Sequence, residues 1–292
     1  MNGAVVLCGG HSRRMGRPKA WLPFGRERLL QRVVRLVAEG IGPGPIVVVA
    51  APGQELPALP RGVMVARDAE ENRGPVQGLA AGMAALPDEV ELVFVSPTDA
   101  PFLQPAWICR LVEAMGDHDI AIPHLDGFYQ PLCALYRRAT VLPELEALIA
   151  ANRMRPVFLL ERLRSRVLEE AELRAVDPSL GTIRNMNMPQ DYARALTDAG
   201  FTRAPAVVRV ELFGIARLRA GVSQVVVEAT TLGGALTEAA REVPELEGVV
   251  LSQGRVLPAH RVSLNGERFL EDPETPLLDG DFLLLISADV GG

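Results

Sequence analysis

The sequence contains almost no lysine. Of its 30 basic residues, only Lys19 is a lysine, and all the others are arginines. Because arginine is the default cation of this chain, a single lysine indicates a position where a compact ammonium on a flexible stem serves better than a planar guanidinium. Such a charge suits close contact with one phosphate oxygen. We therefore take Lys19 as a candidate ligand of an anion.

Cysteine is also scarce, and long apolar runs are missing. Cys8, Cys109 and Cys133 form no C-x-x-C pair, which argues against disulfides and against a zinc site and favours a reducing compartment. No apolar run approaches the ~18 residues that a membrane span requires. No basic leader precedes the first apolar strand. The sequence thus predicts a cytoplasmic protein with no membrane partner.

A basic excess is missing as well. The net charge is −6, and residues 203–292 hold eight arginines against thirteen acidic residues. Nucleic-acid-binding domains usually carry a basic face, so we expect no nucleic-acid partner. The acidic second part either docks on a positively charged partner or only keeps the surface soluble. Charge alone does not decide between these two interpretations.

The first two hundred residues alternate short apolar runs with helical periodicity. This pattern predicts an α/β fold with a mostly parallel, Rossmann-like sheet. The expected strands are Val5–Leu7, Ile46–Ala50, Val63–Ala66, Leu92–Ser96 and Pro131–Tyr136. The expected helices are Leu29–Glu39, Val76–Leu86, Pro105–Met115, Pro143–Ala151 and Pro189–Ala199. Ligands of such sheets bind beyond the carboxyl ends of the strands, so residues that directly follow these strands are expected to share one crevice.

The pattern changes after a short linker at residues 202–206. A chain of 292 residues suggests two domains, which we place at residues 1–203 and 206–292. Two strands of a hairpin, a helix and two further strands are expected at Val207–Phe213, Val222–Val227, Leu232–Glu242, Arg261–Leu264 and Phe282–Ile286. This order indicates a smaller α+β domain of the β-grasp type.

A glycine-rich segment, L-C-G-G-H-S-R-R-M-G-R-P-K, follows the first expected strand and ends at Lys19. Its glycines allow backbone N–H groups to turn toward an anion without obstruction by Cβ atoms. The segment resembles the signature of the MobA-like nucleotidyltransferases, L-x-G-G-x-S-x-R-M-G-x-x-K, with cysteine where a small alanine is usual. The alternative to a nucleotide-binding segment is a glycine-rich turn whose arginines are merely solvated. The resemblance implies a nucleotide site that includes Leu7, Cys8, Gly9 and Gly10.

Three further segments are similar to the molybdenum cofactor guanylyltransferases. They are Asp68 with G-P-V-Q-G-L at residues 74–79, T-D-A-P-F-L at residues 98–103, and N-M-N-M-P-Q-D at residues 185–191. The resemblance implies transfer of GMP from GTP to molybdopterin, with pyrophosphate as the leaving group. Both reactants are anions, so the site must hold them together and neutralise their charge.

The resemblance and this chemistry give each candidate residue a role. Lys19 and Arg13 are candidate catalytic residues that bind the triphosphate. Asp99, which follows a strand and precedes a proline, is the candidate ligand of Mg²⁺, an ion that typically keeps several waters. A turn-forming aspartate is the alternative for Asp99. The wider family leaves two more alternatives open, a CTP-dependent and a sugar-phosphate-dependent nucleotidyltransferase, although the paired glycines of the signature favour GTP.

Three other polar residues have two interpretations each. By resemblance, Asp68 contacts the nucleotide, and the alternative is an aspartate of an ordinary loop. Asn185 and Asn187 either bind substrate or a second metal site, or cap the helix that is expected to begin near Pro189. Cys8 is interpreted as a packing residue, because no general base is identifiable beside it.

The second part resembles the small, sulfur-carrying subunit of molybdopterin synthase. The similar segments are V-E-L-F-G-I-A-R at residues 210–217, S-L-N-G at residues 263–266, L-D-G-D at residues 278–281, and the final Gly291 and Gly292. In that family the terminal glycine is adenylated and converted to a thiocarboxylate. The resemblance implies the synthase large subunit and its activating enzyme as partners. The alternatives are an ordinary terminus and a non-catalytic scaffold that recruits the synthase.

Overall fold

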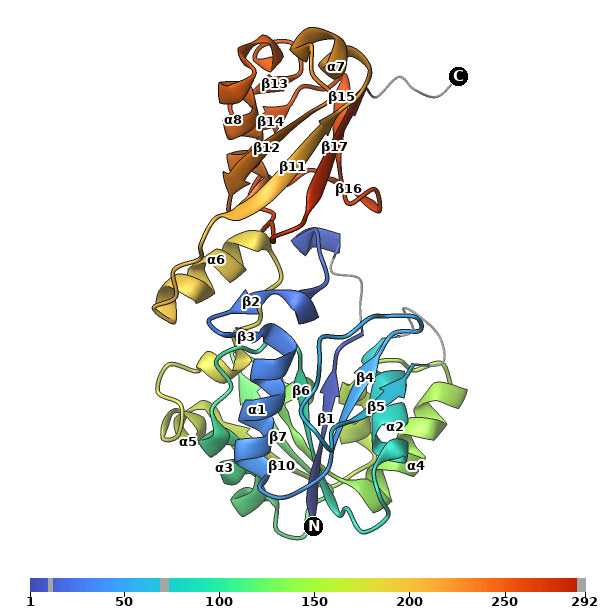
Figure 1. Cartoon of the computed structure of the whole chain (residues 1–292). Coiled ribbons are helices and arrows are strands. Elements are labelled where there is room, and N and C mark those ends of the chain that lie inside the picture. The colour runs from blue at the N-terminus through green and yellow to red at the C-terminus, as the bar shows by residue number, and fades with distance from the viewer. Residues whose placement is uncertain (10–12, 69–73, 288–292) are drawn as a thin grey trace. The chain divides into compact units, whose positions relative to one another are not determined.

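The computed structural model describes residues 1–9, 13–68 and 74–287, and it consists of two compact units (Figure 1). The first unit comprises Met1–His11 and Lys19–Met186, and the second comprises Ser12–Pro18 and Asn187–Gly292. The middle of the glycine-rich signature therefore belongs with the C-terminal part of the chain. The domain boundary at residues 203–206 stays a prediction.

The first unit is built on a mostly parallel sheet of order β10-β7-β9-β6-β1-β4-β5, with β8 paired to β7. Its strands are β1 (Asn2–Leu7), β4 (Ile46–Ala50), β5 (Met64–Arg67), β6 (Leu92–Pro97), β7 (Ile120–Leu125), β8 (Phe128–Tyr129), β9 (Leu135–Arg137) and β10 (Ser165–Glu169). β1 pairs in parallel with both β4 and β6, whereas β9 runs antiparallel between β6 and β7. The predicted α/β class with a mostly parallel sheet is confirmed.

Helices cover both faces of this sheet (Figure 1). They are α1 (Leu29–Ile41), α2 (Pro75–Ala85), α3 (Pro105–Met115), α4 (Arg138–Ala150) and α5 (Glu170–Arg174). Successive residues of β1 face opposite sides, as the pleat of a strand requires. Ala4 and Val6 pack in the cluster that contains α1 and α3, whereas Val5 packs in the cluster that contains α2 and α4. Burial on both faces explains why β4 reads as an uninterrupted apolar run.

Two predicted elements of this unit are wrong. The segment 131–136 begins with a 3₁₀ turn, η3 (Pro131–Cys133), and only β9 is a strand. Helix α4 begins at Arg138 and not at Pro143, which lies within the helix. Pro143 is the sixth of the 13 residues of this helix, where a proline removes one backbone hydrogen bond, which is why the sequence pattern indicated a helix start there. Strands β7 and β10 were not predicted.

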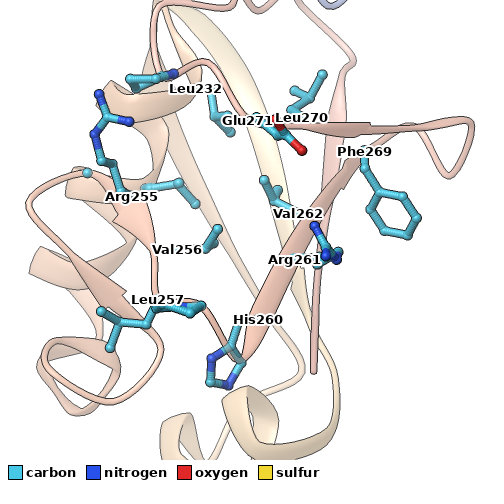
Figure 2. Close-up of a pocket in the computed structure, with 14 residues that line it drawn as sticks. Leu232, Arg255, Val256, Leu257, His260, Arg261, Val262, Phe269, Leu270 and Glu271 are labelled. Carbon is cyan, nitrogen blue, oxygen red and sulfur yellow. The ribbon is translucent and has the colours of Figure 1, made fainter. Parts of the chain in front are cut away.

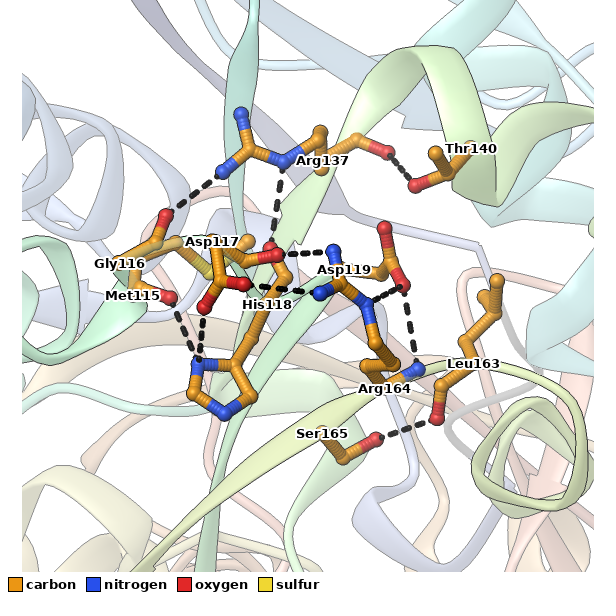
Figure 3. A network of polar contacts seen from close by, with 10 residues as sticks. All are labelled: Met115, Gly116, Asp117, His118, Asp119, Arg137, Thr140, Leu163, Arg164 and Ser165. Atoms are coloured by element: carbon orange, nitrogen blue, oxygen red, sulfur yellow. Dashed lines mark hydrogen bonds and ion pairs between the residues drawn. The ribbon is translucent and has the colours of Figure 1, made fainter.

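The amino-terminal edge of the sheet is held together by a polar network (Figure 3). Arg164, which precedes β10, pairs with Asp117 at 2.8 Å and donates its backbone N–H to Asp119 at 3.1 Å. Arg137, at the end of β9, donates to the carbonyls of Gly116 and His118. The Arg164 guanidinium lowers the pKa of the exposed Asp117 carboxyl. These charges join neighbouring strands at the edge opposite to the one where ligands of such sheets bind.

The second unit contains a five-stranded sheet of order β12-β11-β17-β15-β16. Its strands are β11 (Ala206–Leu212), β12 (Gln224–Ala229), β15 (His260–Leu264), β16 (Arg268–Leu270) and β17 (Phe282–Ser287). Its helices are α6 (Pro189–Asp198), α7 (Gly214–Ala220) and α8 (Leu232–Glu242), and β13 (Leu251–Ser252) pairs with β14 (Arg255–Val256). β11 and β17 are parallel neighbours, whereas the other pairs of the sheet are antiparallel. The apolar face of α8 packs on this sheet.

The predicted hairpin at the start of this sheet is partly wrong. β11 and β12 are antiparallel neighbours as predicted, but the residues between them, for which no element was predicted, form helix α7. The helix is short and ends at Gly221, whose φ of 67° suits a glycine. The predicted turn at Asn265 and Gly266 is confirmed, because both residues have left-handed φ values between β15 and β16. No described helix is long and apolar enough to cross a bilayer.

Candidate active site

The carboxyl ends of β1 and β6 are joined by backbone and side-chain bonds. Leu7 at the end of β1 is paired with Pro97 at the end of β6. The backbone N–H and the hydroxyl of Thr98 both donate to the Leu7 carbonyl, at 3.0 and 2.9 Å. The hydroxyl thus gives Thr98 a structural role at the end of β6. This double contact fixes the point at which Asp99 leaves the sheet.

Asp99 is bonded to the one lysine of the chain. Lys19 Nζ lies 2.6 Å from Asp99 Oδ2, and the two side chains are 18% and 15% exposed. Lys19 begins a 3₁₀ turn, η2 (Lys19–Trp21), followed by the short hairpin of β2 (Pro23–Phe24) and β3 (Glu27–Arg28). The structure therefore brings two predicted site residues together from positions 80 apart in sequence.

The segment that contains the two candidate asparagines reaches the same place. The N–H of Met186 donates to the carbonyl oxygen of Asp99 at 3.2 Å. The capping interpretation of the asparagines is wrong, because the N-cap of α6 is Met188. Asp191 Oδ2 accepts the N–H groups of Asn187 and Met188, so it supplies the capping carboxylate. Asn185 is exposed, and a role of Asn185 and Asn187 in binding stays a prediction.

Asp68 follows β5 and so lies at the same carboxyl edge of the sheet as Asp99. Its N–H donates to the Ala50 carbonyl at 2.9 Å. A Cβ atom built on Gly78 of α2 would lie 3.7 Å from Asp68 Oδ2 and 3.1 Å from Leu7 Cδ2. The structure thus places Asp68, Leu7 and the first turns of α2 close together. Gly78, whose lack of a side chain keeps this space, was not among the predicted site residues.

Cys8 is buried and held by its neighbours. Its N–H donates to the Val49 carbonyl at 2.7 Å, and Gln54 Nε2 donates to the Cys8 carbonyl at 3.1 Å. Burial raises the pKa of the Cys8 thiol above its usual range, so the thiol stays protonated at neutral pH. Packing is therefore the role that the structure supports for this side chain. Gly9 is exposed at the start of the turn.

Several predicted site residues lie wholly or partly outside the described residues. Gly10, Gly291 and Gly292 lie wholly outside them. The backbone of Arg13 begins a 3₁₀ turn, η1 (Arg13–Met15), in the second unit, but its side chain is outside the described part. The roles predicted for these four residues stay predictions.

Arg17 was assigned no role from the sequence, yet it makes the best-buried ion pair of the described signature residues. Its guanidinium donates to Asp281 Oδ2 at 2.7 Å and to the Pro276 carbonyl at 2.9 Å, all within the second unit. Arg17 occupies a variable position of the signature. The signal in the sequence was therefore weak, and it consisted only of an arginine between Gly16 and Pro18.

A separate pocket lies within the second unit, between α8 and the strands β14 and β15 (Figure 2). Its lining mixes apolar side chains with charged ones, and includes Leu232, Val256, Val262, Leu270, Arg255, Arg261 and Glu271. His260 also lines it and is only 6% exposed, and no described group hydrogen-bonds to either of its ring nitrogens. This pocket contains none of the predicted site residues.

Among the described residues, the candidate site therefore combines the Lys19 ammonium, the carboxylates of Asp68 and Asp99 and the exposed backbone of Gly9 at the carboxyl edge of the first sheet. Phosphate-bearing ligands of open α/β sheets bind at this edge, and a lysine beside a carboxylate suits a triphosphate and its metal ion. A mostly parallel α/β sheet with such groups at its carboxyl edge is typical of a nucleotidyltransferase.

Comparison with known proteins defines the family. Residues 4–167 match the family described as the MobA-like NTP transferase domain. A probable molybdenum cofactor guanylyltransferase of Methanosarcina acetivorans is 36% identical over 204 residues, which cover 64% of this chain and 87% of that protein. The chain belongs to the MobA-like NTP transferase family.

Solved structures show the same fold. The crystal structure of molybdopterin-guanine dinucleotide biosynthesis protein A from Archaeoglobus fulgidus aligns with a TM-score of 0.55 at 24% identity, covering 68% of this chain and 98% of that one. That of 2-C-methyl-D-erythritol 4-phosphate cytidylyltransferase from Thermus thermophilus aligns with a TM-score of 0.52 at 18% identity, covering 68% and 100%. One fold thus serves proteins whose names refer to different bases.

Proposed function

We propose that the first part of the chain transfers GMP from Mg-GTP to molybdopterin. The terminal phosphate of molybdopterin attacks the α-phosphorus of GTP, a new P–O bond forms, and the bond to the β-phosphate breaks with release of pyrophosphate. The observation that carries the proposal is the contact between Lys19 and Asp99 at the carboxyl edge of the sheet. The relative in Methanosarcina acetivorans, named as a guanylyltransferase, supports the choice of reaction.

The protein's part in this reaction is to bring two polyanions together. Positioned positive charge lowers the barrier because it stabilises the charge that develops on the phosphate oxygens, and alignment of the two reactants removes much of the entropic cost. Lys19 binds the triphosphate of GTP as a point charge, and Arg13 is the second cation. The Cys8 N–H is already used by the Val49 carbonyl, so the backbone N–H groups that would receive the phosphates are those that follow it in the signature, beginning with Gly9, while Leu7 and Cys8 would border the site.

A magnesium ion fits the donor set at this edge. No cluster of three or more His, Cys, Asp or Glu side chains suited to a metal occurs among the described residues. Mg²⁺ is often held by one or two carboxylates with phosphate oxygens and water, and Asp99 offers such a carboxylate, 15% exposed at the strand end. Bound there, the ion would neutralise phosphate charge, while Lys19 would turn from Asp99 to the triphosphate.

The choice of base rests on the paired glycines of the signature. Paired glycines go with GTP in similar sequences, and CTP or a sugar-phosphate substrate is the alternative. Asp68 and the space kept by Gly78 lie beside Leu7, where they would contact the nucleotide. Turnover with GTP, CTP and UTP at equal concentrations separates these possibilities: we expect GTP to be used at least tenfold better in kcat/KM, and equal or better use of CTP would reject the assignment.

We also propose that residues 206–292, beyond a first domain of residues 1–203, form a β-grasp sulfur carrier for molybdopterin synthesis. Central parallel strands β11 and β17, flanked by antiparallel strands and covered by α8, support the β-grasp assignment. β17 leads directly into the segment that ends in Gly291 and Gly292. The partners would be the large subunit of molybdopterin synthase and the enzyme that activates the terminal carboxylate.

Mass spectrometry tests the carrier role directly. After incubation with the activating enzyme, ATP and a sulfur source, Gly292 should carry one sulfur in place of one oxygen. Deletion of Gly291 and Gly292 should abolish this change and leave GMP transfer intact. A full-length tail that remains unmodified would reject the carrier role and leave the domain as a scaffold that recruits the synthase.

A further inference from the structure

Residues 13–18, which directly precede Lys19, are part of the C-terminal compact unit. Arg17 connects them to it through two bonds to the Asp281 carboxylate, of 2.7 and 3.3 Å, and one to the Pro276 carbonyl. The two side chains are 9% and 6% exposed. Burial removes much of the screening by water that weakens surface ion pairs, so this contact is a specific feature of the fold.

The Asp281 carboxylate is organised to receive the guanidinium. Leu278 donates its N–H to Oδ2 at 2.7 Å, and Asn265 Nδ2 donates to Oδ1 at 3.1 Å. The Asn265 side chain is oriented in turn, because its Oδ1 accepts the N–H of Phe282 at 2.9 Å. The S-L-N-G and L-D-G-D segments, which resemble parts of a sulfur carrier, therefore meet at one carboxylate, and its partner is an arginine of the nucleotide signature.

A second, independent contact holds the same segment. Gly16 has a φ of +73°, and a Cβ atom built on it would lie 2.5 Å from Cγ2 and 2.9 Å from Oγ1 of Thr275. Thr275 is 1% exposed and its hydroxyl donates to the Asp272 carbonyl, so it cannot move aside easily. Only glycine fits this position. The glycine of the M-G pair in the signature is thus required here by packing within the second unit.

We propose that Arg17 and Asp281 are positioning residues for nucleotide transfer. They hold the segment of residues 13–18, which directly precedes Lys19, and only Pro18 separates Arg17 from that lysine. The C-terminal domain then affects GTP binding through the chain that connects it to Lys19, whether or not it carries sulfur. Because coupling between binding and order is reciprocal, GTP binding also stabilises the C-terminal domain. This inference depends on the GTP-dependent activity proposed above.

The test compares full-length Asp281→Asn and Gly16→Ala with the wild-type protein and with Asp279→Asn. Asp279 lies in the same L-D-G-D segment, but it accepts the N–H of Val207 and makes no described contact with Arg17. We expect the first two variants to raise the KM for GTP by about tenfold with a smaller change in kcat, and the control to match the wild type. Gly16→Ala changes only the signature segment, which keeps the test valid if Asp281→Asn folds poorly.

Thermal unfolding provides a readout that a purely structural role would not change. Saturating Mg-GTP should raise the unfolding temperature of the C-terminal domain in the wild type and in Asp279→Asn, and this gain should disappear in Asp281→Asn and Gly16→Ala. An active wild type whose KM and ligand-induced stabilisation are unaffected by both substitutions would overturn the inference. A wild type that does not use GTP would instead reject the proposed function.

Discussion

Lys19 Nζ donates to Asp99 Oδ2 at 2.6 Å, so the two groups that we assign to the triphosphate and to its metal ion are partners of each other. Each is only partly exposed, and each keeps the other at the edge of the sheet where β1 and β6 end. The pair places an ammonium and a carboxylate before the ligand arrives. Mg-GTP would then exchange partners with groups that are already in position.

This relationship predicts that the two residues act as a unit. Lys19→Gln and Asp99→Asn should each lower kcat/KM for GMP transfer by more than about a hundredfold, or about 3 kcal/mol. The double variant should lose much less than the product of the two single losses, because each substitution already disables the pair. Steady-state kinetics of the four proteins measures the coupling. Losses that multiply fully would show that the residues act separately.

Chemical labelling tests whether Lys19 binds the nucleotide. An amine-acylating reagent has only two targets in this chain, Lys19 and the N-terminal amine. Mg-GTP should slow acylation of Lys19 because the ammonium is then engaged with phosphate, while the N-terminus serves as an internal control in each digest. Equal labelling of Lys19 with and without nucleotide would count against its role.

The three thiols should differ in their reaction with iodoacetamide. Cys109 is exposed, whereas Cys8 and Cys133 are buried. Burial raises the pKa of Cys8 and raises that of Cys133 to about 12. Since the thiolate is the reactive form, a raised pKa means less reaction at a given pH. We expect modification of Cys109 alone at pH 8, measured by peptide mapping, and rapid labelling of Cys8 there would contradict the buried site.

Gly82 of α2 packs directly on the sheet. A Cβ atom there would lie 2.5 Å from Cγ1 of Val5 and 2.9 Å from Cγ2 of Val49. Gly→Ala in a helix is normally favourable by about 1 kcal/mol, but here overpacking should destabilise the first unit by about 1–3 kcal/mol. Gly234→Ala in α8 is the control, because its closest contact would be 3.4 Å. Urea unfolding that shows Gly82→Ala to be stabilising would reject this packing.

His260 should be replaceable by an apolar residue. It is 6% exposed, and within residues 13–18 and 187–287 no group bonds to its ring nitrogens. A buried polar group without a partner costs about 1–3 kcal/mol. His260→Leu should therefore raise the unfolding free energy of the second unit, measured in urea. A clear loss of stability would show that the pocket of Figure 2 supplies a partner for the imidazole.

The sequence predicted the regular elements best where burial makes the pattern simple. The bounds of β4 and α3 agree with the structure because one is buried on both faces and the other begins at a proline after a polar residue. β9 was misplaced because a three-residue antiparallel strand within a parallel sheet carries little periodicity. Helix α7 was missed because the two strands around it read as a simple hairpin.

The candidate site was predictable in part. The sequence indicated that Asp68 and Asp99 share the carboxyl edge of the sheet, since that inference needs only the parallel order of the strands. The pairing of Arg17 with Asp281 had no local signal, because 264 positions separate the two residues. Contacts of this kind depend on how distant segments fold together, which periodicity and motif spacing do not describe.

The most direct test of the account is the rate of GMP transfer from Mg-GTP to molybdopterin by full-length wild-type protein, Asp99→Asn and Asp88→Asn. Asp88 is fully exposed and lies before β6, away from the carboxyl edge. We predict that the wild type and Asp88→Asn form the guanine dinucleotide at the same rate and that Asp99→Asn is slower by more than about a hundredfold. Undiminished transfer by Asp99→Asn would contradict the assignment of the site.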